Sequence, residues 1–166
     1  MRLVIVESPY AGDPAAVERN IAYARAAMHD CLSRGEVPFA SHLLYTQPGV
    51  LNDSVPTERR LGIAAGLEWG RAADATVVYT DLGETLGMIE GVGRANLCGR
   101  PVEYRQLPEW LVPGLEVRLA SAESSLVATC MSNDRAYTDG TVDLINARIA
   151  DLRRQLAEAL EVAAAE

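Results

Sequence analysis

The first candidate for ligand binding is the segment of residues 8–13, Ser-Pro-Tyr-Ala-Gly-Asp. Ser8 and Tyr10 supply hydroxyl groups, while Ala11 and Gly12 supply backbone N–H groups and room for a ligand to approach the backbone closely. The segment stands between an apolar run and a predicted helix, whose N-terminus can hold an anion. The alternative is an ordinary turn in which Asp13 caps that helix.

His42 and Tyr45 form the second candidate, after the next apolar run. We expect them on the same rim of the fold as residues 8–13. An imidazole titrates near neutral pH, but a structural hydrogen bond in a loop or in the core is the alternative role for His42. The other histidine, His29, falls on a predicted helix, so the sequence predicts no histidine-based metal site.

Carboxylates form the third candidate. Asp81 follows a third apolar run, and Glu84 and Glu90 come shortly after it. A carboxylate at the end of a strand is costly in a core but useful against the hydroxyl groups of a ligand. Gly83 and Gly87 bracket a loop that can close around a small molecule. In the alternative interpretation Asp81 caps a turn and Glu84 is simply solvated.

Alternating strands and helices position these candidates. Four apolar runs predict strands, at residues 3–6, 37–40, 74–79 and 101–104. The second run is expected to lead directly to Tyr45, with a long loop over residues 46–56. Helices are predicted between the strands, at residues 14–34, 57–73 and 87–98. This order predicts a doubly wound, Rossmann- or flavodoxin-like parallel sheet of four or five strands with helices on both faces. Such sheets bind ligands outside the carboxyl ends of their strands, where the candidates fall.

The C-terminal part of the chain follows a weaker pattern. Residues 115–119 alternate and predict an edge strand, and residues 141–163 predict a long C-terminal helix. Its apolar stripe, from Val142 to Leu160, packs either on the sheet of the same chain or against a second copy. We therefore expect one domain over residues 1–166, with a core over 1–105 and an extension of unknown role over 106–140. We also expect a homodimer or a higher homo-oligomer.

Composition limits the class of partner. The chain has 166 residues, 49% of them hydrophobic, and a formal net charge of −8 without a dense Lys/Arg run, so polymeric nucleic acid is not an expected partner. No apolar run approaches the ~20 residues of a membrane span. The three cysteines are widely spaced and odd in number, which favours a reducing cytoplasm and no disulfide framework. A small phosphorylated ligand stays compatible, because backbone N–H groups hold an anion locally.

Several segments, taken in order through residues 2–105, together resemble the bacterial and phage branch of the nucleoside 2-deoxyribosyltransferase-like superfamily. The resemblance rests on residues 8–13, 38–45 and 58–62, on Gly87-Met88 with Ala95, and on residues 99–103. It implies the same α/β fold, a nucleoside or nucleotide ligand without a cofactor, and pockets close to subunit contacts.

The resemblance also implies residue roles. In the characterised members of the superfamily, a glutamate near the start of the helix after the third strand attacks the anomeric carbon and displaces the base. Glu90 is implied in that role, Asp81 as the group that holds the sugar or protonates the base, and Tyr10 as a positioning residue. A carboxylate there stabilises an oxocarbenium-like transition state and can trap it as an ester. The implied substrate contacts are Ser8, Ala11, Gly12, His42, Tyr45, Gly87 and Met88.

One departure from the superfamily pattern concerns Glu90. The pattern is Gly-Met, two residues and then Glu, with Ala four residues later, and here Gly91 stands at the expected position. A displacement by one residue rotates a helical side chain by about 100°. Either a rearranged loop returns Glu90 to the pocket, or the site is altered or inactive.

The sequence therefore predicts cleavage or 2-deoxyribosyl transfer at the N-glycosidic bond of a nucleoside or nucleotide. The enzyme would be an N-glycosidase or a deoxyribosyltransferase, without a metal. The alternative is a catalytically inert nucleoside- or nucleotide-binding protein of the same fold. A third hypothesis is a structural oligomer with a vestigial pocket.

Overall fold

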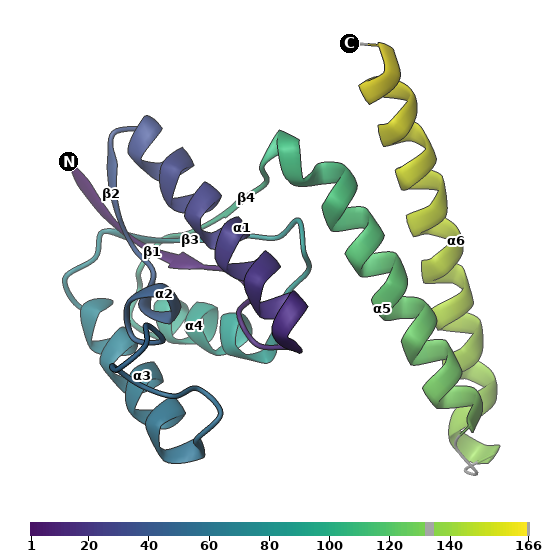
Figure 1. Cartoon of the computed structure of the whole chain (residues 1–166), viewed down its shortest axis with the longest axis horizontal. Coiled ribbons are helices and arrows are strands. Elements are labelled where there is room, and N and C mark those ends of the chain that lie inside the picture. The colour runs from purple at the N-terminus through teal and green to yellow at the C-terminus, as the bar shows by residue number, and fades with distance from the viewer. Residues whose placement is uncertain (132–134, 166) are drawn as a thin grey trace. The chain divides into compact units, whose positions relative to one another are not determined.

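The computed structural model describes residues 1–131 and 135–165 (Figure 1). The chain forms two compact units: Met1–Thr80 with Glu84–Leu107, and Asp81–Gly83 with Pro108–Glu166. Residues 132–134 of the predicted extension, and residue 166, lie outside the described residues.

The first unit is built on a four-stranded parallel sheet in the order β2-β1-β3-β4. The strands are β1 (Arg2–Glu7), β2 (Glu36–Phe39), β3 (Ala75–Tyr79) and β4 (Val102–Arg105). All five residues of β3 and the centre of β1 are buried, because helices cover both faces of these central strands. The predicted doubly wound α/β fold is confirmed.

Three long helices connect these strands. They are α1 (Pro14–Ser33), α3 (Pro56–Trp69) and α4 (Leu86–Leu97). The β1–α1–β2 connection runs in one direction along the sheet, whereas the connections through α3 and α4 run in the other. Right-handed crossovers therefore put α1 on one face and both α3 and α4 on the opposite face (Figure 1). Asp13 caps α1, as predicted, by accepting a hydrogen bond from the backbone N–H of Ala16 at 2.8 Å.

The segment after β2 differs from its prediction. Residues 41–44 form a short helix, α2 (Ser41–Leu44), rather than an extension of the strand, so His42 lies on a helix. The cause is tertiary packing against α3, where Gly66 lets the two helices approach closely. A Cβ at Gly66 would lie only 2.7 Å from the Cβ of Ser41. The helix α3 also ends at Trp69, four residues before the predicted end.

The second unit is a helical hairpin. It contains the short helix η1 (Pro108–Trp110) and two long helices, α5 (Leu111–Met131) and α6 (Arg135–Ala165). The predicted edge strand over residues 115–119 is wrong, because these residues belong to α5 and their apolar members continue at helical spacing. None of the helices in residues 1–131 and 135–165 combines the length and the apolar composition that a membrane span requires.

The apolar stripe of α6 packs against α5. The buried residues of this interface are Leu115, Ala122, Ile149 and Leu152, and the half-buried members include Leu119, Leu126, Ile145 and Leu156. The middle of the predicted stripe is therefore buried within the hairpin, while Leu160 at its end is 49% exposed, and association with a second copy stays a prediction. The stripe is buried there because α5, which includes the predicted strand over residues 115–119, is a helix with a matching apolar stripe.

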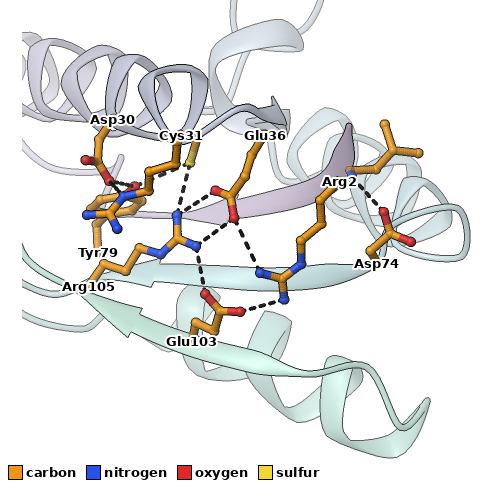
Figure 2. Close-up of polar contacts among 10 residues, drawn as sticks. Arg2, Asp30, Cys31, Glu36, Asp74, Tyr79, Glu103 and Arg105 are labelled. Atoms are coloured by element: carbon orange, nitrogen blue, oxygen red, sulfur yellow. Dashed lines mark hydrogen bonds and ion pairs between the residues drawn. The ribbon is translucent and has the colours of Figure 1, made fainter.

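A polar network ties three strands of the sheet together (Figure 2). Arg105 on β4 donates two hydrogen bonds to the carboxylate of Glu36 at the start of β2, at 2.7 and 2.8 Å, and one to Glu103 at 2.7 Å. Arg2 on β1 completes the network with an ion pair of 2.5 Å to Glu103. Hydrogen bonding to Arg105 lowers the pKa of the buried Glu36 carboxyl. The network thus holds a buried carboxylate ionised.

The same network continues to α1 through Tyr79 (Figure 2). The phenol of Tyr79 donates to the carboxylate of Asp30 at 2.6 Å and lies 3.3 Å from the sulfur of Cys31. Burial raises the pKa of both the Tyr79 phenol and the Cys31 thiol. These groups are satisfied within the fold and serve to join α1 to the sheet.

Candidate functional site

A cavity of about 340 Å³ opens in the first unit at the carboxyl ends of β1 and β2. Ligands bind at this edge of doubly wound sheets, and a volume of roughly 300–1,000 Å³ suits a small molecule. Its apolar wall includes Ile5, Leu51, Ile63, Leu67 and Met88. The polar groups come from the segment after β1, from α2 and from the start of α4.

Eight of the ten predicted site residues line this cavity. They are Ser8, Tyr10, Ala11, His42, Tyr45, Gly87, Met88 and Glu90. Gly12 lines a more open depression, which shares Tyr10 and Ala11 with the cavity. Asp81 belongs to the second unit, where it is buried next to Gly114. A Cβ at Gly114 would lie 3.1 Å from the Cβ of Asp81.

Ser8 and His42 form a hydrogen-bonded pair in the cavity wall. The Ser8 Oγ lies 2.8 Å from the Nε2 of His42, and the ring of Tyr10 stands 6.2 Å from the His42 ring. Burial lowers the pKa of His42 to about 4, so the imidazole is neutral at neutral pH. The direction of the hydrogen bond depends on the tautomer. This pair offers a ligand hydrogen bonds rather than a positive charge.

An aromatic cluster fixes Tyr45. The indole N–H of Trp69 donates to the Tyr45 hydroxyl at 2.9 Å, and the ring of Phe39 lies 6.3 Å from that of Tyr45 and 5.0 Å from that of Trp69. The cluster joins the end of β2 to α3, so the position of Tyr45 depends on the same packing that makes residues 41–44 helical.

Charged side chains of the loop before α3 and of α3 itself line part of the cavity. Arg59 forms an ion pair with Asp53, and the Glu58 carboxylate accepts a hydrogen bond from the backbone N–H of Asn52 at 2.6 Å. These interactions give the long predicted loop a defined conformation. Arg59, Asp53 and Glu58 line both the cavity and the neighbouring depression.

Glu7, the last residue of β1, also lines the cavity and was missed by the sequence analysis. Its carboxyl group lies against the backbone of Gly91 on α4. A Cβ at position 91 would lie 2.5 Å from the Glu7 Cδ and 3.0 Å from its Oε2. The available signal was a carboxylate closing an otherwise apolar strand, but nothing in the sequence links it to Gly91.

The electrostatics of Glu7 are unusual for a carboxyl group. Burial raises its pKa to about 8, an effect that the charge of Arg100 opposes and that of Glu90 reinforces. Arg100 lines the cavity and is held by hydrogen bonds to the Thr76 hydroxyl, at 2.8 Å, and to the carbonyl of Gly70, at 2.6 Å. Glu7 therefore carries its proton at neutral pH, whereas most carboxyl groups are ionised.

Glu90 stands on the first turns of α4, at the border of the cavity. Its side chain is exposed, and the next residue, Gly91, is buried. The structure thus brings two carboxyl groups to one cavity: Glu90 from the helix and Glu7 from the strand. Glu84 is exposed and precedes α4.

Comparison with known proteins gives a family but no activity. Searches of curated proteins and of solved structures found no match. The model of a family described as a domain of unknown function (DUF7768) matches residues 2–105, which span the whole sheet and the helices around the cavity. The chain belongs to this family.

Proposed function

We propose that the protein cleaves or transfers the N-glycosidic bond of a nucleoside or nucleotide, with Glu90 as the attacking group. The observation that carries the proposal is that Glu90 shares one cavity with Tyr10, Ser8 and His42 at the carboxyl ends of parallel strands. Substitution at an anomeric carbon passes through an oxocarbenium-like transition state, which a carboxylate stabilises and can trap as an ester.

The lining of the cavity suits such a substrate. Leu67, Ile63 and Met88 offer an apolar wall to the faces of a base, while Ser8 and the neutral His42 offer hydrogen bonds to a sugar. Pockets with a mostly apolar lining and a few fixed polar groups are typical of small-molecule sites. Tyr10 positions the sugar in this proposal.

A 5′-phosphate would extend toward the open depression. Gly12 and Ala11 present their backbone there, close to the N-terminus of α1, and Arg59 stands at its border. Backbone N–H groups at a helix N-terminus favour an anion. This arrangement supports nucleoside monophosphates as substrates alongside nucleosides. The free cysteines support the cytoplasm as the location in this proposal.

A specific observation favours the inert binder as the second candidate function. Glu90 is exposed, and the buried position on α4 is occupied by Gly91, which has no side chain. In this alternative the cavity holds the same nucleoside or nucleotide without chemistry.

Release of free base tests the proposal. The protein is incubated with the common nucleosides and nucleoside monophosphates, and free base is measured by liquid chromatography. We expect release by the wild type and a loss of several orders of magnitude in Glu90→Gln, with ligand binding preserved in calorimetry. Glu84→Gln is the matched control, because Glu84 is an exposed carboxylate six residues away. Asp81→Asn tests the predicted role of Asp81 in the same assay.

Two outcomes contradict the proposal in different ways. Binding of a nucleotide without release of base from any of these compounds establishes the inert binder. Full activity in Glu90→Gln means that another carboxylate attacks the sugar.

A further inference from the structure

We propose that Glu7 is the general acid of this cavity and protonates the base as it leaves, while Glu90 attacks the sugar. The inference rests on the proposed function and adds a catalytic residue to it. It also defines the substrate class: nucleosides whose unmodified base leaves poorly unless a ring nitrogen is protonated.

The geometry that supports this role is the close approach of β1 to α4. The Glu7 carboxyl group occupies the space that a side chain at position 91 would fill, since a Cβ there would lie 2.5 Å from its Cδ. Glu90 is the adjacent residue of the same helix, and both carboxyl groups line the cavity. One acidic residue from a strand and one from a helix thus border the same cavity.

The surroundings of Glu7 favour its protonated form. Among the described residues, no hydrogen bond or ion pair reaches the Glu7 carboxyl group, so only the charge of Arg100 opposes the cost of burying a charge there. Consistent with this, burial raises its pKa to about 8. A carboxyl group that holds its proton at neutral pH can donate it to a substrate.

The other charged or titratable groups of the cavity leave one cation to act on Glu7. These groups are Tyr10, His42, Tyr45, Asp53, Glu58, Arg59, Glu90 and Arg100. His42 is neutral and hydrogen-bonded to Ser8, and Arg59 forms an ion pair with Asp53. Arg100 donates its hydrogen bonds to uncharged oxygens of Thr76 and Gly70, so its charge can stabilise the carboxylate that forms when Glu7 gives up its proton.

The complete reaction balances with these two groups and water. In the first step the bond between C1′ and the base nitrogen breaks, its electron pair stays on the base, and the Glu7 proton moves to a ring nitrogen of the base. A Glu90 oxygen forms an ester bond to C1′. In the second step a water oxygen attacks C1′, its proton returns to Glu7, and the ester bond breaks to restore the Glu90 carboxylate. Transfer replaces the water with a second base.

Substrates that need no general acid test this assignment. N7-methylated purine nucleosides carry a base that is already cationic, so their base leaves without a proton from the enzyme. General acid catalysis typically contributes about 10²–10⁴-fold. We expect Glu7→Gln to lose at least about 100-fold in kcat on unmodified purine nucleosides and less than about tenfold on the methylated ones. Glu90→Gln should lose activity on both.

The pH profile is the second readout. With unmodified nucleosides, the wild-type rate should fall as the pH rises through about 8, because Glu7 loses its proton. With N7-methyladenosine, whose cationic base has no ring N–H to lose in this range, this alkaline fall should be absent. If Glu7→Gln does not fold, Gly91→Ala serves instead, since its methyl group displaces the Glu7 carboxyl group and should give the same selective loss.

The outcomes separate the two proposals. If wild-type protein releases base from methylated and unmodified nucleosides but Glu7→Gln and Gly91→Ala slow both classes equally, or neither, Glu7 is not the general acid and the proposed function stands. If wild-type protein releases base from neither class, the proposed function fails and this inference fails with it.

Discussion

The carboxyl group of Glu7 lies against the backbone of Gly91, in space that any other residue at position 91 would occupy with its side chain. The contact joins the end of β1 to the first half of α4 at the wall of the cavity. The position of Glu7 depends on this helix having no side chain there, and burial in that position raises the pKa of its carboxyl group. The neighbouring glycine of the same helix, Gly93, has open space where a Cβ would lie.

The first prediction compares these two glycines of α4. Gly91→Ala forces the Glu7 carboxyl group to move and should destabilise the fold by about 1–3 kcal/mol, as overpacking does. Gly93→Ala meets no atom within 4 Å and should stabilise it by about 0.5–1 kcal/mol, because alanine favours a helix over glycine. Urea unfolding measures both. Equal effects of the two substitutions would contradict the contact between Glu7 and Gly91.

The second prediction concerns stability against pH. The pKa of Glu7 is raised to about 8 in the fold from an ordinary value of 4.5, so the native state binds more protons than the unfolded chain between these values. The contribution of Glu7 is complete below pH 4.5 and is lost as the pH rises toward 8. Its maximal slope is about 1.4 kcal/mol per pH unit.

Glu7→Gln should remove this slope, because an amide does not titrate. The difference between wild type and variant in the free energy of unfolding, measured in urea between pH 5 and 8.5, isolates the contribution of Glu7 from that of other groups. A difference that stays constant across this range would show that the Glu7 carboxyl group is ionised in the fold.

The third prediction concerns the network around Arg105. Arg105→Ala leaves the buried Glu36 carboxylate with only the longer Arg2 contact of 3.4 Å, and should cost about 3–5 kcal/mol. Arg153→Ala is the matched control, since its 2.8 Å ion pair with Glu123 is exposed and such pairs contribute about 0–1 kcal/mol. Thermal or urea unfolding should rank the two accordingly. A cost below that of the control would mean that Glu36 is adequately stabilised without Arg105.

The fourth prediction is that the chain forms at least a homodimer. The middle of the α6 stripe is covered by α5, so self-association would use the apolar side chains of the hairpin that stay exposed. Val127, Leu144 and Val162 are 59%, 74% and 63% exposed. Light scattering at micromolar concentration should give a dimer or larger species, which Leu144→Glu should weaken. Leu97→Glu on α4 is the control, with a side chain 83% exposed in the other unit. A monomeric wild type contradicts this prediction.

The sequence by itself determined the elements of the first unit and their order. The apolar runs of β1 and β3 and the cap at Asp13 are local signals, and the alternation of strands with helices leaves few topologies when crossovers are right-handed. Because parallel strands place their carboxyl ends at one edge, the sequence also brought Tyr10, His42 and Glu90 to a common site.

Only the tertiary structure decided the rest. Residues 41–44 form a helix that packs closely against α3, where Gly66 has no side chain to clash with Ser41. Residues 115–119 are helical because their apolar side chains pack against the apolar stripe of α6. The sequence did not indicate Glu7 as a site residue, because its carboxyl group lies in space left by Gly91, which is distant in the chain and has no side chain. Local patterns report which residues face a core, but the protonation of a carboxyl group depends on burial and neighbouring charges that exist only once β1 and α4 have packed together.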